Sequence, residues 1–230
     1  MAVLRLREPS VVGTALGHHA ADSIRDAILQ GSLLPGQRLV ESAIAAQLNL
    51  SRGPVRDALR QLAVEGLVAI VPRRGTFVSQ LSGVDIQEIS TLRGAIEGLA
   101  ARLLAEEHDE ETIKQLEVLL EEMAEVGDED PVRFAALDLE FHETLARRSG
   151  HRRLYQSWRN LRTQIWMFIR ETRLSKLGSA ESTREVHESI VRAIVAGDSA
   201  EAERATRFHA ESSGTRLRDF LARQSHQGGD

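Results

Sequence analysis

Apolar residues recur at helical spacing along most of this chain, and short apolar strands are predicted in only one place. Before residue 80, amphipathic stripes predict three helices, and two apolar runs on either side of a Pro-Arg-Arg-Gly turn predict a β-hairpin. The predicted helices span about 18–30, 41–47 and 52–65, and the predicted strands span 68–71 and 76–78. Ser51 fits the N-cap of the third helix, and Pro54 lies in its first turn, where a missing N–H is harmless.

Beyond residue 85 the pattern is helical throughout, with no further strand signal. Glycine and aspartate breaks divide this region into six predicted helices: 85–107, 110–126, 131–149, 151–175, 180–196 and 198–222. The pattern therefore predicts a mainly α protein, in which a winged helix-turn-helix at 18–80 precedes an all-helical bundle at 85–222. The remaining segments are expected to be a flexible N-terminus (1–17), a linker (81–84) and a flexible tail (223–230).

Charge is distributed unevenly along the chain, although the formal net charge is only −5. Residues 1–80 hold nine Lys and Arg against six Asp and Glu, whereas the rest holds twenty against twenty-eight. A basic module on an acidic body fits a protein that attracts phosphates at one end. There is no cysteine, which excludes disulfides and thiolate zinc sites, and no signal peptide or membrane-length apolar run. We therefore expect a cytoplasmic protein without a membrane partner.

Three arginines of the predicted third helix, Arg52, Arg56 and Arg60, follow one another at intervals of four, so they lie along one side. Arginine can donate two parallel hydrogen bonds to guanine, and other arginines can bind phosphates. Gly53 permits close approach of the backbone to a groove. The candidate DNA contacts of the helix and of the hairpin tip are Ser51, Arg52, Gly53, Arg56, Arg60, Arg73, Arg74 and Gly75. The alternative is a solvated basic helix whose arginines pair with Asp57 and Glu65.

These residues carry a resemblance to a known family. Residues 39–78, with the motifs LSRGPVRDALRQLAVEGLV and RRGTFV, resemble the DNA-binding domain of the GntR family of bacterial repressors. The resemblance implies DNA contacts from Ser51, Arg52, Gly53, Arg56 and Gly75. Gly53 stands where many members have threonine, and Ser42 stands where some have arginine, so the contact set of this chain differs from theirs.

Three histidines lie inside predicted amphipathic helices of the second domain. Asp138 precedes His142 by four residues on one helix face, and His187 and His209 lie on the last two helices. One carboxylate and three imidazoles form a suitable ligand set for a divalent transition metal such as Zn, Ni or Mn. Alternatively, each histidine is a hydrogen-bonded residue of the core.

The second domain resembles the FCD effector domain of the FadR subfamily, and its six helices resemble the VanR-type branch. That resemblance implies metal binding by Asp138, His142, His187 and His209. It also implies that Arg93 binds the carboxylate of an effector; on spacing alone, Arg93 would instead form a surface pair with Glu97.

We therefore expect a ligand-responsive transcriptional regulator, and specifically a repressor, rather than an enzyme. It would bind a pseudo-palindromic double-stranded DNA operator as a homodimer and respond to a small carboxylic or sugar acid. Two alternatives stay open from the sequence. One is a metal-dependent hydrolase-like enzyme, for which Glu140 and Glu143 are weak candidates as general base. The other is a metal-free structural helical domain.

Overall fold

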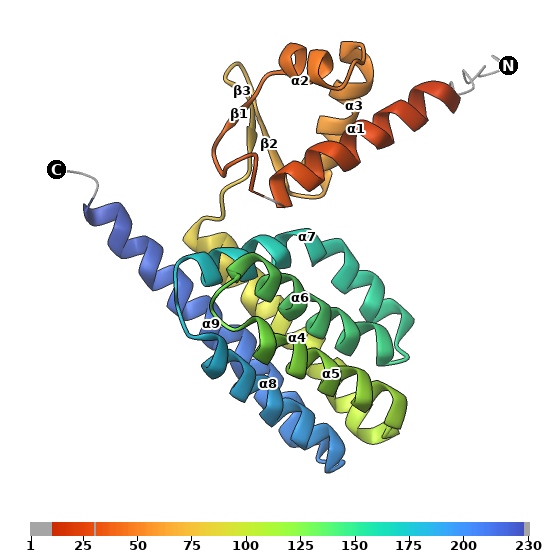
Figure 1. Ribbon diagram of the computed structural model, residues 1–230, viewed down its shortest axis with the longest axis vertical. Coiled ribbons are helices and arrows are strands. Elements are labelled where there is room, and N and C mark those ends of the chain that lie inside the picture. Colours follow the sequence, from red (N-terminus) through yellow and green to blue (C-terminus); the bar gives the residue numbers. More distant parts are fainter. Residues whose placement is uncertain (1–10, 30, 228–230) are drawn as a thin grey trace, which may run out of the picture. The chain divides into compact units, whose positions relative to one another are not determined.

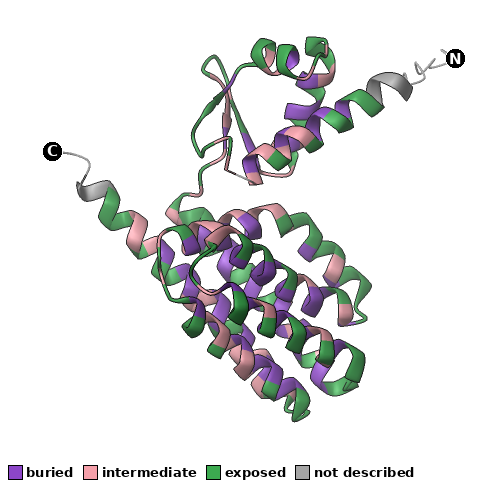
Figure 2. Cartoon of the chain, in the orientation of Figure 1, coloured by how far each residue is buried: buried purple, intermediate pink, exposed green. Residues whose placement is uncertain are grey.

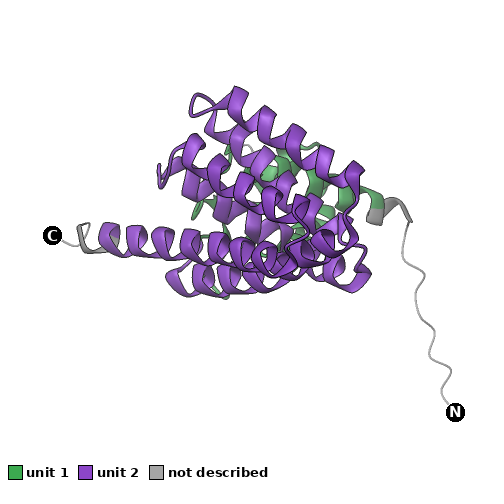
Figure 3. Cartoon of the chain, turned by 90° about the horizontal axis from the view of Figure 1, so that it is seen from below, with its two compact units in different colours: residues 1–80 green, residues 81–230 purple. Residues whose placement is uncertain are grey.

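The computed structural model describes residues 11–29 and 31–227, which belong to two compact units, 1–80 and 81–230 (Figures 1 and 3). Unit 1 contains a small antiparallel sheet and three helices. Its elements are α1 (Val11–Leu29), β1 (Arg38–Leu39), α2 (Glu41–Gln47), α3 (Arg52–Val64), β2 (Val68–Val71) and β3 (Gly75–Val78). This is a helix-turn-helix followed by a wing.

The core of unit 1 forms where α1 packs against α3. Ala20 and Ala21 of α1 and Val55 and Ala58 of α3 are completely buried. Small side chains let the two helices approach closely, and a Cβ added to Gly17 would lie 3.8 Å from the carbonyl oxygen of Pro54. This packing holds α3 from behind and leaves its arginine-bearing side exposed.

The wing has three strands in the order β1-β3-β2, with Ala69 opposite Phe77 and Arg38 opposite Phe77 on the other edge. The two longer strands agree with the predicted hairpin. The sequence pattern did not predict β1, because two residues are too few to show alternation.

Unit 2 is a bundle of six described helices whose buried residues, most of them apolar, face the interior (Figures 1 and 2). They are α4 (Gly83–Glu107), α5 (Glu110–Val126), α6 (Pro131–Arg148), α7 (Arg152–Leu174), α8 (Ala180–Val195) and α9 (Ser199–Gln227). Helices α4 and α9 lie side by side over much of their length. A Cβ added to Gly98 of α4 would lie 3.1 Å from the carbonyl oxygen of Glu203, so the two backbones nearly touch there.

Three segment boundaries differ from expectation. Helix α1 begins at Val11, inside the segment expected to be a flexible N-terminus, because Gly17 and Ala20 belong to its packing stripe against α3. Helix α4 begins at Gly83, inside the expected linker, where Ser82 and Asp85 form a reciprocal capping box. Helix α9 continues to Gln227 because no helix breaker occurs before the glycines that follow. Residues 1–10 and 228–230 lie outside the described residues.

None of the described helices is long and apolar enough to cross a membrane.

Candidate functional site

The exposed side of α3 carries the arginines predicted to bind DNA. Arg52, Arg56 and Arg60 are exposed, whereas Leu59 and Leu62 on the opposite side are buried. Ser51 occupies the N-cap with extended backbone (φ −76°, ψ 164°), yet its side chain accepts no capping hydrogen bond within the described chain. The hydroxyl at this helix start is therefore available to another partner, such as a phosphate.

Two of these arginines have acidic neighbours. Arg56 Nη2 lies 2.9 Å from Glu41 Oε2 of α2, and Arg60 Nη1 lies 3.6 Å from Asp57 Oδ1. Hydrogen bonding and the charge of Arg56 lower the pKa of Glu41 below its ordinary value. Because both pairs are solvent-exposed, they are weak, and a phosphate can displace the carboxylate.

The tip of the wing brings a further arginine to the candidate DNA-binding surface. Gly75 has φ +120°, and a Cβ added to it would lie 3.1 Å from Arg38 Nε, so β1 places Arg38 directly against the tip. Arg73 and Arg74 are exposed in the same turn, and Arg73 has a positive φ of 63°. Sequence reasoning missed Arg38 because only the pairing of β1 with β3 brings it to the wing.

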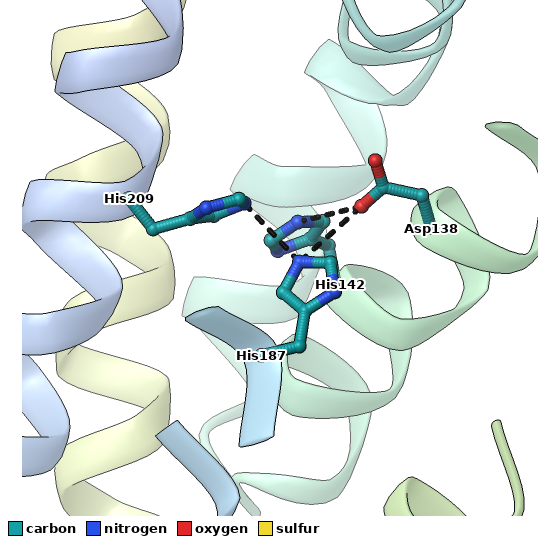
Figure 4. A group of neighbouring side chains, drawn as sticks. All are labelled: Asp138, His142, His187 and His209. Carbon is teal, nitrogen blue, oxygen red and sulfur yellow. Dashed lines mark hydrogen bonds and ion pairs between the residues drawn. The ribbon is translucent and has the colours of Figure 1, made fainter. Parts of the chain in front are cut away.

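In unit 2, four side chains from three helices meet in the interior: Asp138, His142, His187 and His209 (Figure 4). Asp138 and His142 are one turn apart on α6, His187 comes from α8 and His209 from α9. One ligand atom from each residue lies within 4.8 Å of the other three. The structure thus brings together all four residues that the FCD resemblance proposed as metal ligands.

The spacing of the donor atoms suits a single cation. The Nε2 atoms of His142 and His187 lie 3.1 and 3.4 Å from Asp138 Oδ1, and the Nε2 atoms of His187 and His209 are 3.2 Å apart. Bonds of about 2.1 Å from one ion give neighbouring donors separations of roughly 3.0 to 3.4 Å. Asp138 Oδ1 and His142 Nε2 are buried and have no hydrogen bond within the described residues. Leaving such an atom unpaired costs about 1–3 kcal/mol, which a bound cation would remove.

A buried network supports this cluster from α4. Arg93 and Glu97 are 1% and 0% exposed, so the expected surface alternative for this pair is wrong. Arg93 Nε and Nη2 donate to the two oxygens of Glu97 at 3.0 and 3.3 Å, and Trp158 Nε1 donates to Oε1 at 2.9 Å. Glu97 Oε2 also lies 2.9 Å from His142 Nδ1, which is a charge contact without hydrogen-bond geometry. Glu97 is therefore both the partner of Arg93 and the carboxylate behind a cluster histidine.

Sequence reasoning treated Glu97 only as a surface partner, although a signal was present. Ile86, Ile89 and Leu104 of α4 are buried at helical spacing with Arg93 and Glu97. The two charged residues therefore interrupt an apolar stripe, and charged residues are rarely buried unless they are paired.

The pKa values of the three cluster histidines shift in different directions. Burial lowers the pKa of His187 to about 3, although Asp138 opposes the shift. Burial likewise lowers the pKa of His209 well below its ordinary value, and the neighbouring His187 adds to the effect. For His142, burial is outweighed by the nearby carboxylates of Glu97 and Asp138, so its pKa is raised. Two imidazoles are therefore neutral near pH 7, which is the form that binds metals.

A small cavity of about 30 Å³ adjoins the cluster. Its wall includes Arg93, Asp138, Arg173, Thr183, His209 and Arg216. Roughly two water molecules fill such a volume. The cavity connects the candidate metal ligands with Arg93, the residue expected to bind an effector.

Two domain families match this chain. The family described as "Bacterial regulatory proteins, gntR family" matches residues 16–78, and the FCD domain matches residues 88–212. The first match includes the arginines of α3 and the wing. The second includes Arg93 and all four cluster residues.

Individual relatives agree with these matches. The chain is 35% identical over 199 residues to the "Probable D-xylose utilization operon transcriptional repressor" of Paenarthrobacter nicotinovorans, covering 85% of this chain and 86% of the relative. It is 34% identical to the gluconate operon transcriptional repressor of Bacillus subtilis, covering 66% and 63%. Among solved structures, a GntR transcriptional regulator from Rhodococcus sp. RHA1 superposes with a TM-score of 0.74 at 25% identity, covering 89% of this chain and 98% of that one.

Proposed function

This chain belongs to the GntR family of DNA-binding transcriptional regulators and carries an FCD domain, and we propose that it is a repressor controlled by a small carboxylic or sugar acid. Its family consists of regulators, not enzymes. In this proposal a divalent transition metal (Zn, Ni or Mn) is held by Asp138, His142, His187 and His209. The effector lies in the adjoining cavity. The observation that carries the proposal is the buried cluster itself, in which the potential metal-binding atoms Asp138 Oδ1 and His142 Nε2 face each other without a hydrogen bond.

The charge of the buried site supports an anionic effector. When the three histidines are neutral, as metal binding requires, two buried carboxylates, Asp138 and Glu97, face the buried guanidinium of Arg93. The other buried guanidinium at the cavity, Arg173, is paired with Asp128, so one excess negative charge remains. A divalent cation on the cluster reverses the excess to one positive charge. A bound metal supplies an open position to a carboxylate or hydroxyl oxygen. The site then favours an anion over a neutral molecule of the same shape.

Arg93 lies on the cavity wall, and we propose that it donates hydrogen bonds to the effector. Because the cavity holds only about two waters, a sugar acid must enlarge it. Leu177 and Gly178, between α7 and α8, line one side of the cavity. Arg173, near the end of α7, holds this segment in place: its Nη1 donates to the carbonyl of Gly178 at 3.2 Å, and its Nη2 donates to Asp128 at 2.6 Å. An effector that displaces this segment changes the packing of the bundle.

On the DNA side, we propose that Ser51, Arg52, Gly53, Arg56, Arg60, Arg73, Arg74 and Gly75 contact the operator, with Arg38 joining them at the wing. The wing and the N-terminal end of α3 are the parts that enter or flank the grooves in winged helix-turn-helix proteins. Two copies in a homodimer would bind a pseudo-palindromic operator. The effector weakens repression only by its differential affinity for the DNA-binding and non-binding arrangements.

The metal proposal is tested with His187→Ala. Purified wild-type protein should hold about one transition-metal ion per chain by mass spectrometry, and the variant should lose most of it. Metal affinity should fall by more than the roughly 10- to 100-fold that the loss of a hydrogen-bond partner behind a ligand costs, because one of the four ligands itself is removed. Operator binding without effector should be retained, measured by fluorescence anisotropy on a duplex selected from a random pool.

The matched control is His108→Asn, which alters an exposed histidine of the same unit. His108 ends α4 in a left-handed conformation (φ 54°), which asparagine tolerates, so both metal content and stability should persist. Wild-type protein that takes up no stoichiometric metal after loading would overturn the metal proposal and favour a metal-free helical domain.

A further inference from the structure

One wall of the cavity is formed by a short non-helical segment, residues 175–179, which joins α7 to α8. Leu177 and Gly178 of this segment line the cavity. Lys176 and Gly178 have positive φ angles of 53° and 130°, so the chain turns sharply here. The other lining residues belong to helices, whose backbones are held by regular hydrogen bonds. Residues 175–179 are therefore the part of the wall that can move without unwinding a helix.

A carboxylate in the loop between α5 and α6, Asp128, ties both ends of this segment to the rest of the bundle. Its Oδ1 accepts hydrogen bonds from Arg173 Nη2 at 2.6 Å and from the backbone N–H of Ala180 at 2.9 Å. Arg173 Nη1 in turn donates to the carbonyl of Gly178 at 3.2 Å. Within the described chain, no other residue outside α7 and α8 forms a hydrogen bond with residues 173–180.

The ion pair between Asp128 and Arg173 is buried at one end and exposed at the other. The side chain of Arg173 is 6% exposed, and its Cζ lies 4.1 Å from the centroid of the Phe134 ring of α6. The side chain of Asp128 is 63% exposed. Hydrogen bonds from Arg173 and from the N–H of Ala180 lower the pKa of Asp128, so it is ionised at neutral pH. Water can therefore replace Asp128 while Arg173 stays packed on Phe134.

We propose that residues 175–179 form a gate to the cavity and that Asp128 is the latch that keeps this gate closed. The inference rests on the proposed function, because the cavity adjoins the proposed metal and effector site. A cavity of about 30 Å³ holds roughly two water molecules, so a larger solute enters only when a wall moves. Release of the Asp128 oxygen frees both ends of the gate at once.

A latch of this kind controls rates, because Asp128 neither lines the cavity nor belongs to the metal cluster. Opening of the gate speeds entry and exit by the same factor, so their ratio is conserved. Affinity falls only by the fraction of molecules in which the gate is open, which stays small while the closed form predominates. Loss of the charged hydrogen bonds should raise the open fraction about tenfold, the lower end for such bonds, because Asp128 is exposed.

The first test measures opening without any ligand. Hydrogen exchange of the whole metal-free chain is followed by mass spectrometry for wild-type protein and Asp128→Ala. Peptides that cover residues 171–183 should exchange about tenfold faster in the variant, while peptides from α4 should keep the wild-type rate. The matched control is Glu129→Ala, which removes an exposed carboxylate from the same loop and should leave exchange unchanged.

The second test measures passage through the gate. Zinc-loaded protein is mixed with an excess of a chromophoric chelator, and the rate of zinc transfer is recorded. Asp128→Ala should release zinc about tenfold faster than wild type and Glu129→Ala, with an unchanged equilibrium affinity for zinc. A merely structural role of Asp128 would instead weaken zinc binding.

Unchanged exchange of residues 171–183 in Asp128→Ala would overturn this inference while leaving the proposed function intact. Faster exchange throughout unit 2, or faster local exchange with an unchanged rate of zinc release, would overturn it as well. Wild-type protein that takes up no zinc, nickel or manganese would overturn the proposed metal site and this inference with it.

Discussion

Replacing Glu97 by glutamine should destabilise unit 2 strongly, although the two side chains have nearly the same shape. Glu97 is completely buried and neutralises Arg93, which is 1% exposed. Removing one charge of a buried pair costs about 3–5 kcal/mol, because the remaining charge is left uncompensated. Glutamine keeps one acceptor oxygen, so we expect the lower end, about 3 kcal/mol.

The hydrogen-bond geometry explains why glutamine cannot replace Glu97 without a loss of stability. An NH₂ group in the place of Oε1 would face two donors, Arg93 Nε and Trp158 Nε1, which lie 3.0 and 2.9 Å from that oxygen. In the place of Oε2 it would face Arg93 Nη2, which lies 3.3 Å away. Either orientation puts donors against donors, so at least one buried N–H loses its partner.

The assay is thermal unfolding followed by tryptophan fluorescence on metal-free protein. Both tryptophans of the chain, Trp158 and Trp166, lie in α7, so the signal reports unit 2 alone. A loss of about 3 kcal/mol lowers the melting temperature of a unit of this size by roughly 6–12 °C. The matched control is Glu106→Gln, which has the same i, i+4 relation to Arg102 on the surface of α4 and should leave the melting temperature unchanged.

The pH dependence gives a second measure. Despite the opposing effect of burial, Arg93 and His142 lower the pKa of Glu97 well below its ordinary value of 4.5. A carboxyl whose folded pKa is depressed contributes stability that is present above the unfolded pKa and is lost as the pH falls below it. Glu97→Gln should therefore flatten the loss of stability below about pH 4.5. A variant within 1 °C of wild type, with an unchanged acid limb, would refute the account of Glu97 as an ionised buried partner.

Two other predictions concern DNA binding and helix packing. Arg52→Ala and Arg56→Ala should each abolish sequence-specific operator binding in anisotropy titrations. The circular dichroism spectrum should stay unchanged, since both side chains are exposed. Retained specific binding in both variants would contradict the proposal that α3 binds the operator. Gly214→Ala should destabilise unit 2 by about 1–3 kcal/mol in urea unfolding, because the added Cβ would lie 2.4 Å from Ser90 Cβ. Adding Ser90→Gly to this variant should relieve most of that loss. A fully stable Gly214→Ala variant would show that α4 and α9 do not approach this closely.

The secondary structure was largely predictable from local pattern. The run from Ser51 to Leu62 carries an N-cap, an apolar stripe and exposed arginines within four turns, so local chemistry suffices to define α3. The six helices of unit 2 follow from amphipathic repeats and glycine or aspartate breaks in the same way. The FCD resemblance also identified the four cluster residues. The start of α1 was not predictable, because it depends on packing against α3.

The sequence by itself determined which residues are candidates for the chemistry: arginines on one side of α3, and one aspartate and three histidines on amphipathic helices. Tertiary structure decided which of them meet and what charge each one retains. Arg38 reaches the wing only through the pairing of β1 with β3, and the pair of Arg93 with Glu97 is buried only because its stripe on α4 packs inside the bundle. The physical reason is that helical periodicity shows which side of an element a residue occupies. The packing of distant elements sets the burial and charge partners on which its chemistry depends.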